Sequence, residues 1–182
     1  MAAILARRRL TVVVTGSECT GKSTLAASLA AHYHTTWSTE FVRAYLDRKG
    51  SDLDASDVEP IARGQLAEED AAAARAGALL VKDTDLLSTV VYARHYYGRC
   101  PRWIEDAAAA RLGDLYLLLH PDLPWVPDGQ RDRPHAREEM HTLFRETLAA
   151  ASAHVVEIRG VGGARVAAAI RAVNAWLAAH EA

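Results

Sequence analysis

Residues 10–24 read LTVVVTGSECTGKST, a β-branched run followed by a loop with two glycines and a lysine. The run Leu10–Thr15 has the length and composition of a buried parallel strand. Beyond the loop, Leu25, Leu29 and Tyr33 recur every four positions, as on the buried face of a helix. The stretch therefore predicts a strand, a glycine-rich loop and a helix in direct succession.

The loop has the spacing G-x-x-x-x-G-K-S, which is typical of a turn that binds polyphosphate. Its glycines let successive backbone N–H groups point into one concavity, where the following helix presents its positive end. We expect Lys22 to bridge the terminal phosphates of ATP and Ser23 to place its hydroxyl on Mg²⁺. The predicted nucleotide-binding residues are Gly16, Ser17, Glu18, Cys19, Thr20, Gly21, Lys22, Ser23 and Thr24.

Segments of strand and helix character alternate through the rest of the chain. Strand-like runs occur at 34–40, 78–83, 115–120 and 154–160, and helix-like stretches lie between several of them. This alternation predicts an α/β protein with the P-loop NTPase fold, a five-stranded parallel sheet with helices on both faces. Ligands on such sheets bind at the carboxyl ends of the strands.

Composition limits the classes of partner. The 182 residues include 21 Lys and Arg against 23 Asp and Glu, which gives a formal net charge of −2. No basic field indicates nucleic acid or an anionic membrane as a partner, so we expect a small-molecule substrate. The two cysteines do not suggest a disulfide framework, and no apolar run reaches the roughly 20 residues that span a bilayer. The sequence therefore predicts a soluble, cytoplasmic protein.

Two acids follow the apolar run 78–83 closely and suggest the second half of a metal site. Asp83 ends the run, and Asp85 stands two positions further on. Acids at the carboxyl end of a strand can face a Mg²⁺ ion that bridges nucleotide phosphates. Asp83 is the expected metal ligand together with Ser23. For Asp85 two interpretations remain open, a contact in the site and a cap for the following helix.

The segment 121–137, PDLPWVPDGQRDRPHAR, contains four prolines and is predicted to form a loop. Its residues Arg131, Arg133 and Arg137 could close over the transferring phosphoryl group and exclude water, as the lid of a small kinase does. A solvated loop is the alternative. The chain has no guanine-selective N-K-x-D motif, and we expect no room for the accessory domains of most motors, which favours a small kinase.

Glu40 is the candidate base, since it is predicted to end the second strand beside the nucleotide. Arg43, three residues later, could hold the substrate or orient Glu40. The alternative is an ordinary acid and arginine at the start of a helix. The cluster of Tyr92, Tyr96, Tyr97 and Trp103 is interpreted as core rather than as a ring-stacking surface.

Longer motifs resemble a known family. They are GSECTGKSTLA, TEFVRAY, IARGQLAEED, DTDLLSTVVYARHYYGRCPRW and DLYLLLHPDLPWVPDGQR. Together they resemble the nicotinamide riboside kinase (ribosylnicotinamide kinase) domain of the bacterial NAD-salvage regulator family, from about residue 10 to the C-terminus. The resemblance implies a nucleoside-kinase-like P-loop sheet. It also implies transfer of the γ-phosphate of ATP to the ribose 5′-hydroxyl, which gives nicotinamide mononucleotide.

The resemblance also implies roles for individual residues. Glu40 and Arg43 would lie near the ribose, with Asp85 in the D-T-D motif as a further substrate contact. The lid would contribute substrate contacts from Trp125 and Asp128 and a charge-neutralising Arg131. From its place in the same charged loop, we also expect Arg133 to contact the nucleotide. We expect a leader over residues 1–9 and a single kinase domain over residues 10–182, with its lid at about 121–137. A kinase of another nucleoside or small alcohol and a non-catalytic ATP-binding module remain alternatives.

Overall fold

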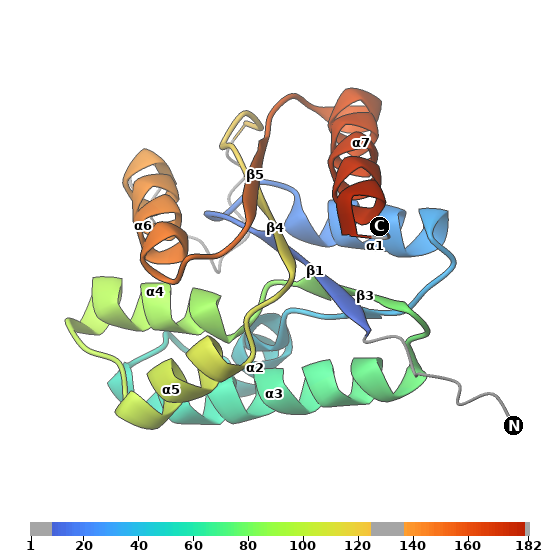
Figure 1. Ribbon diagram of the computed structural model, residues 1–182. Helices are drawn as coiled ribbons and strands as arrows, with labels where there is room; N and C mark the ends of the chain where they lie inside the picture. Colours follow the sequence, from blue (N-terminus) through green and yellow to red (C-terminus); the bar gives the residue numbers. More distant parts are fainter. Residues whose placement is uncertain (1–8, 125–136, 181–182) are drawn as a thin grey trace, which may run out of the picture.

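The computed structural model describes residues 9–124 and 137–180. Five parallel strands form one sheet in the order β2-β3-β1-β4-β5, with helices packed on both faces (Figure 1). This confirms the predicted architecture. The strands are β1 Leu10–Thr15, β2 Trp37–Ser38, β3 Leu79–Asp83, β4 Leu115–Leu119 and β5 Val155–Ile158.

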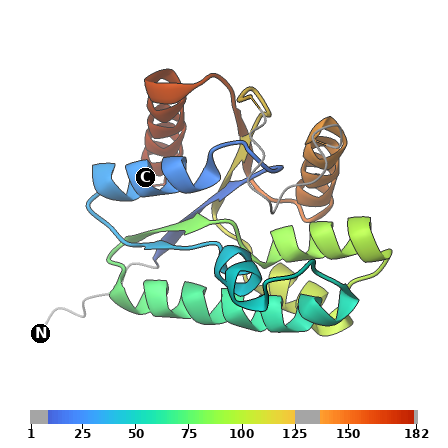
Figure 2. The ribbon, with the colours of Figure 1, turned by 180° about the vertical axis from the view of Figure 1, so that it is seen from behind.

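The helices divide between the two faces of the sheet (Figures 1 and 2). One face is covered by α1 and α7, and the other by α3, α4, α5 and α6, while α2 packs on α3. No helix in the described part of the chain is long and apolar enough to cross a bilayer. The helices are α1 Lys22–His32, α2 Phe41–Lys49, α3 Val58–Arg75, α4 Leu86–Tyr97, α5 Arg102–Ala110, α6 Arg137–Ala150 and α7 Gly162–His180, with a 3₁₀ turn, η1, at Ala55–Asp57.

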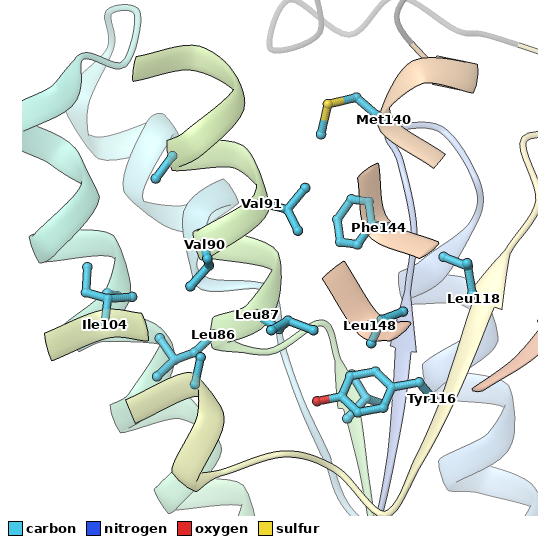
Figure 3. Packing of buried hydrophobic residues seen from close by; sticks show 14 of the residues in the cluster. Leu86, Leu87, Val90, Val91, Ile104, Tyr116, Leu118, Met140, Phe144 and Leu148 are labelled. Carbon is cyan, nitrogen blue, oxygen red and sulfur yellow. The ribbon is translucent and has the colours of Figure 1, made fainter. Parts of the chain in front are cut away.

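Alternation along the strands separates two hydrophobic clusters. Side chains of β1 and β4 point alternately to α1 and α7 or to the helices of the opposite face, and none of the eleven β1 and β4 positions is exposed. Figure 3 shows the second cluster, in which Tyr116 and Leu118 of β4 lie on the side of Phe144 and Leu148 of α6. The two clusters fix the carboxyl ends of β1 and β3 between α1 and α4, where the candidate site lies.

The structure differs from the predicted elements at two places. The second strand is limited to Trp37–Ser38, because the N–H groups of residues 34 and 35 bond to carbonyls at the end of α1 and Glu40 already forms the N-cap of α2. The helix α6 had not been assigned from the sequence, although Met140, Phe144 and Leu148 recur every four positions and are buried.

A close approach between α2 and α3 depends on Gly64. A Cβ atom at this position would lie 2.1 Å from Cε1 of Phe41. The next residue of α3 adds a polar contact, because the backbone N–H of Phe41 donates to Oε1 of Gln65 at 3.0 Å. The missing side chain of Gly64 therefore sets the distance at which α2 packs, and α2 carries Arg43.

We expect Gly64→Ala to destabilise the protein, because the added methyl group must displace Phe41 and α2. Overpacking costs about 1–3 kcal/mol and outweighs the roughly 1 kcal/mol that alanine gains over glycine in a helix. Urea unfolding measures the change. Gly77→Ala is the matched control, since a Cβ atom at Gly77 meets no atom within 4 Å. Equal stability of the two variants would contradict the packing argument.

Candidate functional site

The phosphate loop connects β1 to α1 in the conformation that the glycines predict. Gly16, Cys19 and Gly21 have positive φ angles of 138°, 54° and 80°. At Gly16 a Cβ atom would lie 2.9 Å from the backbone oxygen of Leu119, so no side chain fits there. The loop also closes on itself, because the Thr20 hydroxyl donates to the Ser17 carbonyl at 2.8 Å. Successive turns of this kind form an anion-binding concavity.

Lys22 lies inside this concavity. Its ammonium group is buried and donates to the carbonyls of Gly16 and Ser17, both at 3.1 Å. The positive charge is therefore held within the loop at the start of α1, where anions are favoured by the helix dipole. Phosphate oxygens bound in the loop would compete with these two carbonyls for the three N–H donors of the ammonium group.

Behind the loop, Arg165 of α7 braces the backbone. Its buried guanidinium donates to the carbonyl oxygens of Thr20 and His120, the latter at 3.0 Å, and lies 3.5 Å from Asp122. The sequence analysis missed this residue, because nothing in the local pattern shows that α7 reaches the phosphate loop. Its contacts tie the loop to the end of β4.

Asp83 and Ser23 meet beside the loop. Asp83 is buried beside Ser23, whose hydroxyl favours the charged form of the carboxylate, whereas the Oδ1 atom of Asp83 has no hydrogen-bond partner among the residues described. Burial, followed by the negative charge of Glu40, raises the pKa of Asp83 to about 6, although Ser23, Lys22 and Arg43 oppose the shift. A buried carboxylate oxygen without a partner beside a hydroxyl matches the oxygen ligands of Mg²⁺.

The described residues contain no cluster of three or more His, Cys, Asp or Glu side chains that could hold a metal ion alone. A Mg²⁺ ion that binds together with a nucleotide usually takes one or two protein ligands and completes its shell with phosphate and water.

The raised pKa of Asp83 predicts a stability cost in the metal-free protein. The folded state retains this proton up to about pH 6, whereas the ordinary pKa is 3.8, so the contribution of Asp83 to stability falls as the pH rises from about 4 to 6. We therefore expect Asp83→Asn to raise the free energy of unfolding at pH 7 by up to about 3 kcal/mol.

Urea unfolding in EDTA at pH 4 and pH 7 measures this effect, and the gain should be confined to the higher pH. Asp106→Asn, at an exposed position of α5, is the matched control with the same change of charge. An Asp83→Asn variant that is no more stable than this control at pH 7 would contradict the assignment.

Asp85 does not face the metal site, which corrects the prediction that places it among the substrate contacts. Its carboxylate accepts from the backbone N–H of Leu87 at 3.1 Å and from the Tyr116 hydroxyl at 2.6 Å. It is therefore a helix cap. The reason lies at Thr84, whose positive φ of 64° interrupts the strand geometry, so that Asp83 and Asp85 do not share a face.

Glu40 and Arg43 form a pair at the start of α2. Arg43 Nε donates to Glu40 Oε2 at 2.9 Å, and the Glu40 side chain is 11% exposed. The electrostatic effect of both residues on Asp83 shows that the pair lies close to the candidate metal site. The ion pair with Arg43 limits the orientation of the Glu40 carboxylate beside Asp83.

A cavity of about 800 Å³ extends from the phosphate loop to α4. Glu18 and Lys22 line it together with Glu40 and Arg43. Further lining residues are apolar or aromatic, namely Val42, Leu46, Leu53, Val58, Ile61, Tyr92, Ala93, Tyr96 and Tyr97. Tyr92 and Tyr97 also pack against the hydrophobic cluster of that face, as predicted, so these rings belong both to the core and to the cavity wall. Trp103 is half-buried against the same cluster, and its Nε1 donates to Glu59 at 3.0 Å.

Acids outnumber bases in the wall of this cavity. Two bases, Lys22 and Arg43, stand against six acids, Glu18, Glu40, Asp47, Asp52, Asp54 and Asp57. Asp54 and Asp57 are partly compensated by Lys49, and Asp57 also accepts from the Tyr45 hydroxyl at 2.7 Å. The excess of acid favours a ligand that carries positive charge away from its phosphate-accepting end.

Part of the predicted lid cannot be placed. Trp125, Asp128, Arg131 and Arg133 lie outside the described residues. Arg137 begins α6, and its guanidinium donates to the Leu123 carbonyl at 2.8 Å. It thereby connects the two ends of the segment 124–137.

A family model described as an AAA domain matches residues 11–165 of the chain. The chain belongs to this family. It is also homologous to the trifunctional NAD biosynthesis/regulator protein NadR. The Escherichia coli (strain K12) protein is 34% identical over 144 residues, which cover 76% of this chain and 35% of that protein. The Salmonella typhimurium protein is 35% identical over 125 residues, which cover 66% and 30%. The chain thus corresponds to about a third of these relatives.

Solved structures agree with this relationship. A NadR protein in complex with NR has a TM-score of 0.80 at 26% identity, with 92% of this chain and 51% of that chain covered. A NadR protein in complex with NAD and AMP-PNP has a TM-score of 0.77, also at 26% identity, with 92% and 49% covered. Thymidylate kinase from Ehrlichia chaffeensis, at 14% identity and a TM-score of 0.64 with 92% and 99% covered, shares the fold.

Proposed function

We propose that the chain is an ATP- and Mg²⁺-dependent kinase that transfers the γ-phosphate to the 5′-hydroxyl of nicotinamide riboside and gives nicotinamide mononucleotide. The observation that carries the proposal is the cavity that joins the phosphate loop, Glu40 and a wall of tyrosines and acids. The NadR structures, one with NR and one with an ATP analogue, support the same pairing of ligands.

The transfer follows from the positions of the chain's own groups. The backbone N–H groups of the loop would hold the polyphosphate, and Lys22, whose ammonium group is held in the loop, would neutralise charge on the transferring group. Ser23 and Asp83 would hold Mg²⁺, which supplies neutralisation of the phosphate oxygens. Glu40 accepts the proton of the 5′-hydroxyl, whose oxygen forms a bond to the γ-phosphorus while the bond to the leaving ADP oxygen breaks.

The charge of the cavity wall supports a cationic substrate. The pyridinium ring of nicotinamide riboside carries a permanent positive charge, and a ring of this kind is favoured by nearby acids and by the faces of tyrosine rings. Besides Glu18 and Glu40, the acids come from α2 and from the segment 50–57, and the tyrosines come from α4. Neutral nucleosides gain nothing from the acids.

The segment 121–137 completes the proposal as a lid. Arg131 and Arg133 would neutralise the phosphates, and Trp125 and Asp128 would contact the riboside. These roles rest on the sequence motif. The lid would exclude water from the transferring group, which separates a kinase from an ATPase.

The substrate is tested by competition. The protein is incubated with ATP, Mg²⁺ and an equimolar mixture of nicotinamide riboside, its reduced and uncharged form, and the common nucleosides, and early products are identified by mass spectrometry. We expect nicotinamide mononucleotide as the main product, ahead of the reduced form, which has the same shape without the ring charge. Preference for the uncharged riboside or for a common nucleoside would overturn the substrate assignment.

A further inference from the structure

Thr84 has an unusual backbone conformation at the edge of the site. It follows the last residue of β3 with a φ of 64°, a value that β-branched residues rarely adopt. Its N–H donates to the Val14 carbonyl at 2.9 Å, and the residue lines the cavity. Its Oγ1 atom is buried and has no hydrogen-bond partner in the described part of the chain. Strain of this kind persists only where the surroundings fix it.

The residues on either side of Thr84 are anchored in a buried polar network. Lys82 Nζ donates to Glu69 Oε2 of α3 at 2.7 Å. Asp85 accepts from the Tyr116 hydroxyl at 2.6 Å, and this oxygen accepts in turn from the Gly113 N–H at 3.1 Å. Lys82, Glu69, Asp85 and Tyr116 are all at most 5% exposed.

A network of this kind is expensive for stability alone. A buried ion pair usually stabilises the folded state no more than apolar residues of the same size would, because both charges lose their hydration. The two anchors lie immediately before and after the pair formed by Asp83 and Thr84, with Lys82 in the strand and Asp85 at the start of α4. Their position indicates that they fix the path of the chain between these two points.

We propose that Lys82, Glu69, Asp85 and Tyr116 form a buried clamp that holds Thr84 in its left-handed conformation and thereby directs Asp83 to Ser23 and the metal. They are positioning residues, and none of them contacts the cavity. The expected effect of the clamp on the reaction rests on the proposed function. Its effect on the binding of nucleotide with Mg²⁺ at Asp83 does not depend on which molecule accepts the phosphate.

The clamp is tested with Tyr116→Phe, which removes one hydroxyl, and with the double variant Lys82→Met with Glu69→Leu, which removes both charges. The first readout is the gain in affinity for a non-hydrolysable ATP analogue when EDTA is replaced by Mg²⁺, and the second is kcat. We expect each variant to lower both by about tenfold, the scale at which positioning contacts to a metal ligand act.

Thr84→Gly separates positioning from general stability. Glycine adopts a positive φ without strain, so the clamp should become redundant in this background. In the Thr84→Gly background we expect Tyr116→Phe to lower the gain in affinity from Mg²⁺ by less than about threefold, because coupled residues are not additive in a double-mutant cycle. Val173→Ala, which opens the core under α7, is the control that should lower the melting temperature and leave the gain from Mg²⁺ unchanged.

Each outcome decides the inference. A Tyr116→Phe variant with an unchanged gain from Mg²⁺, or an equal cost with and without Thr84→Gly, would overturn the clamp. If the wild type phosphorylates no riboside while the gain from Mg²⁺ still depends on Tyr116 and Thr84 in this way, the clamp stands and the proposed function falls. If the wild type phosphorylates nicotinamide riboside while the gain in affinity from Mg²⁺ does not depend on Tyr116 or Thr84, the proposed function stands and the clamp falls.

Discussion

Replacing Lys22 by alanine should lower kcat by about 10²–10³, because removal of one preorganised charge at a transferring group costs about 3–4 kcal/mol. Among the described residues, the ammonium group is buried in the phosphate loop and donates to the carbonyls of Gly16 and Ser17, so the substitution removes a charge that is held inside the loop. Initial rates of phosphorylation measure the loss, with the melting temperature recorded for each variant.

The control for this substitution is Arg171→Ala, which removes one positive charge from an exposed position of α7. It should leave the rate within about twofold, since exposed charges far from the site are screened by salt. Normal turnover of Lys22→Ala would show that the loop does not take part in phosphoryl transfer, whatever it binds.

Glu40→Gln should bind the ATP analogue normally and lose about 10²–10⁴ in kcat, the range that general base catalysis contributes. The amide oxygen can still accept the hydrogen bond from Arg43, so the pair at the start of α2 keeps its geometry. The variant therefore tests proton transfer rather than folding. Single-turnover measurements separate the chemical step from the binding steps.

The same variant has a consequence for pH. The charge of Glu40 is the second cause, after burial, that raises the pKa of Asp83. Its removal should lower that pKa, so that binding of the ATP analogue with Mg²⁺ persists to a lower pH than in the wild type. Glu59→Gln is the control, because Glu59 is an exposed acid of α3. Transfer at the wild-type rate would remove Glu40 from the catalytic role.

The elements that were predicted correctly have strong local signals. The apolar runs that became β1, β3 and β4 lie in the interior of the sheet, and the loop spacing fixes the start of α1. The short edge strand β2 lacks such a signal, because only two of its residues pair with β3. Helix α6 could have been predicted, since Met140, Phe144 and Leu148 have helical spacing. The preceding proline-rich stretch gives no signal for where the helix begins.

The site residues divide in the same way. The loop, Asp83 and the Glu40–Arg43 pair follow from motifs, and the structure brings them together. The direction of the Asp85 side chain depends on the positive φ angle of Thr84, and a threonine in the sequence does not predict such an angle. The acids of the cavity wall could not be predicted either, because Asp52 and Asp57 come close to the tyrosines of α4 only when α2 packs on α3. Contacts between distant segments are what the single sequence could not supply.

The most direct test of the account is phosphorus NMR of the protein with ATP, Mg²⁺ and nicotinamide riboside as the only acceptor. The account predicts a 5′-phosphomonoester that appears in equal amount with ADP, with little free phosphate. Bound ATP with no phosphomonoester, or ADP accompanied only by free phosphate, would contradict it.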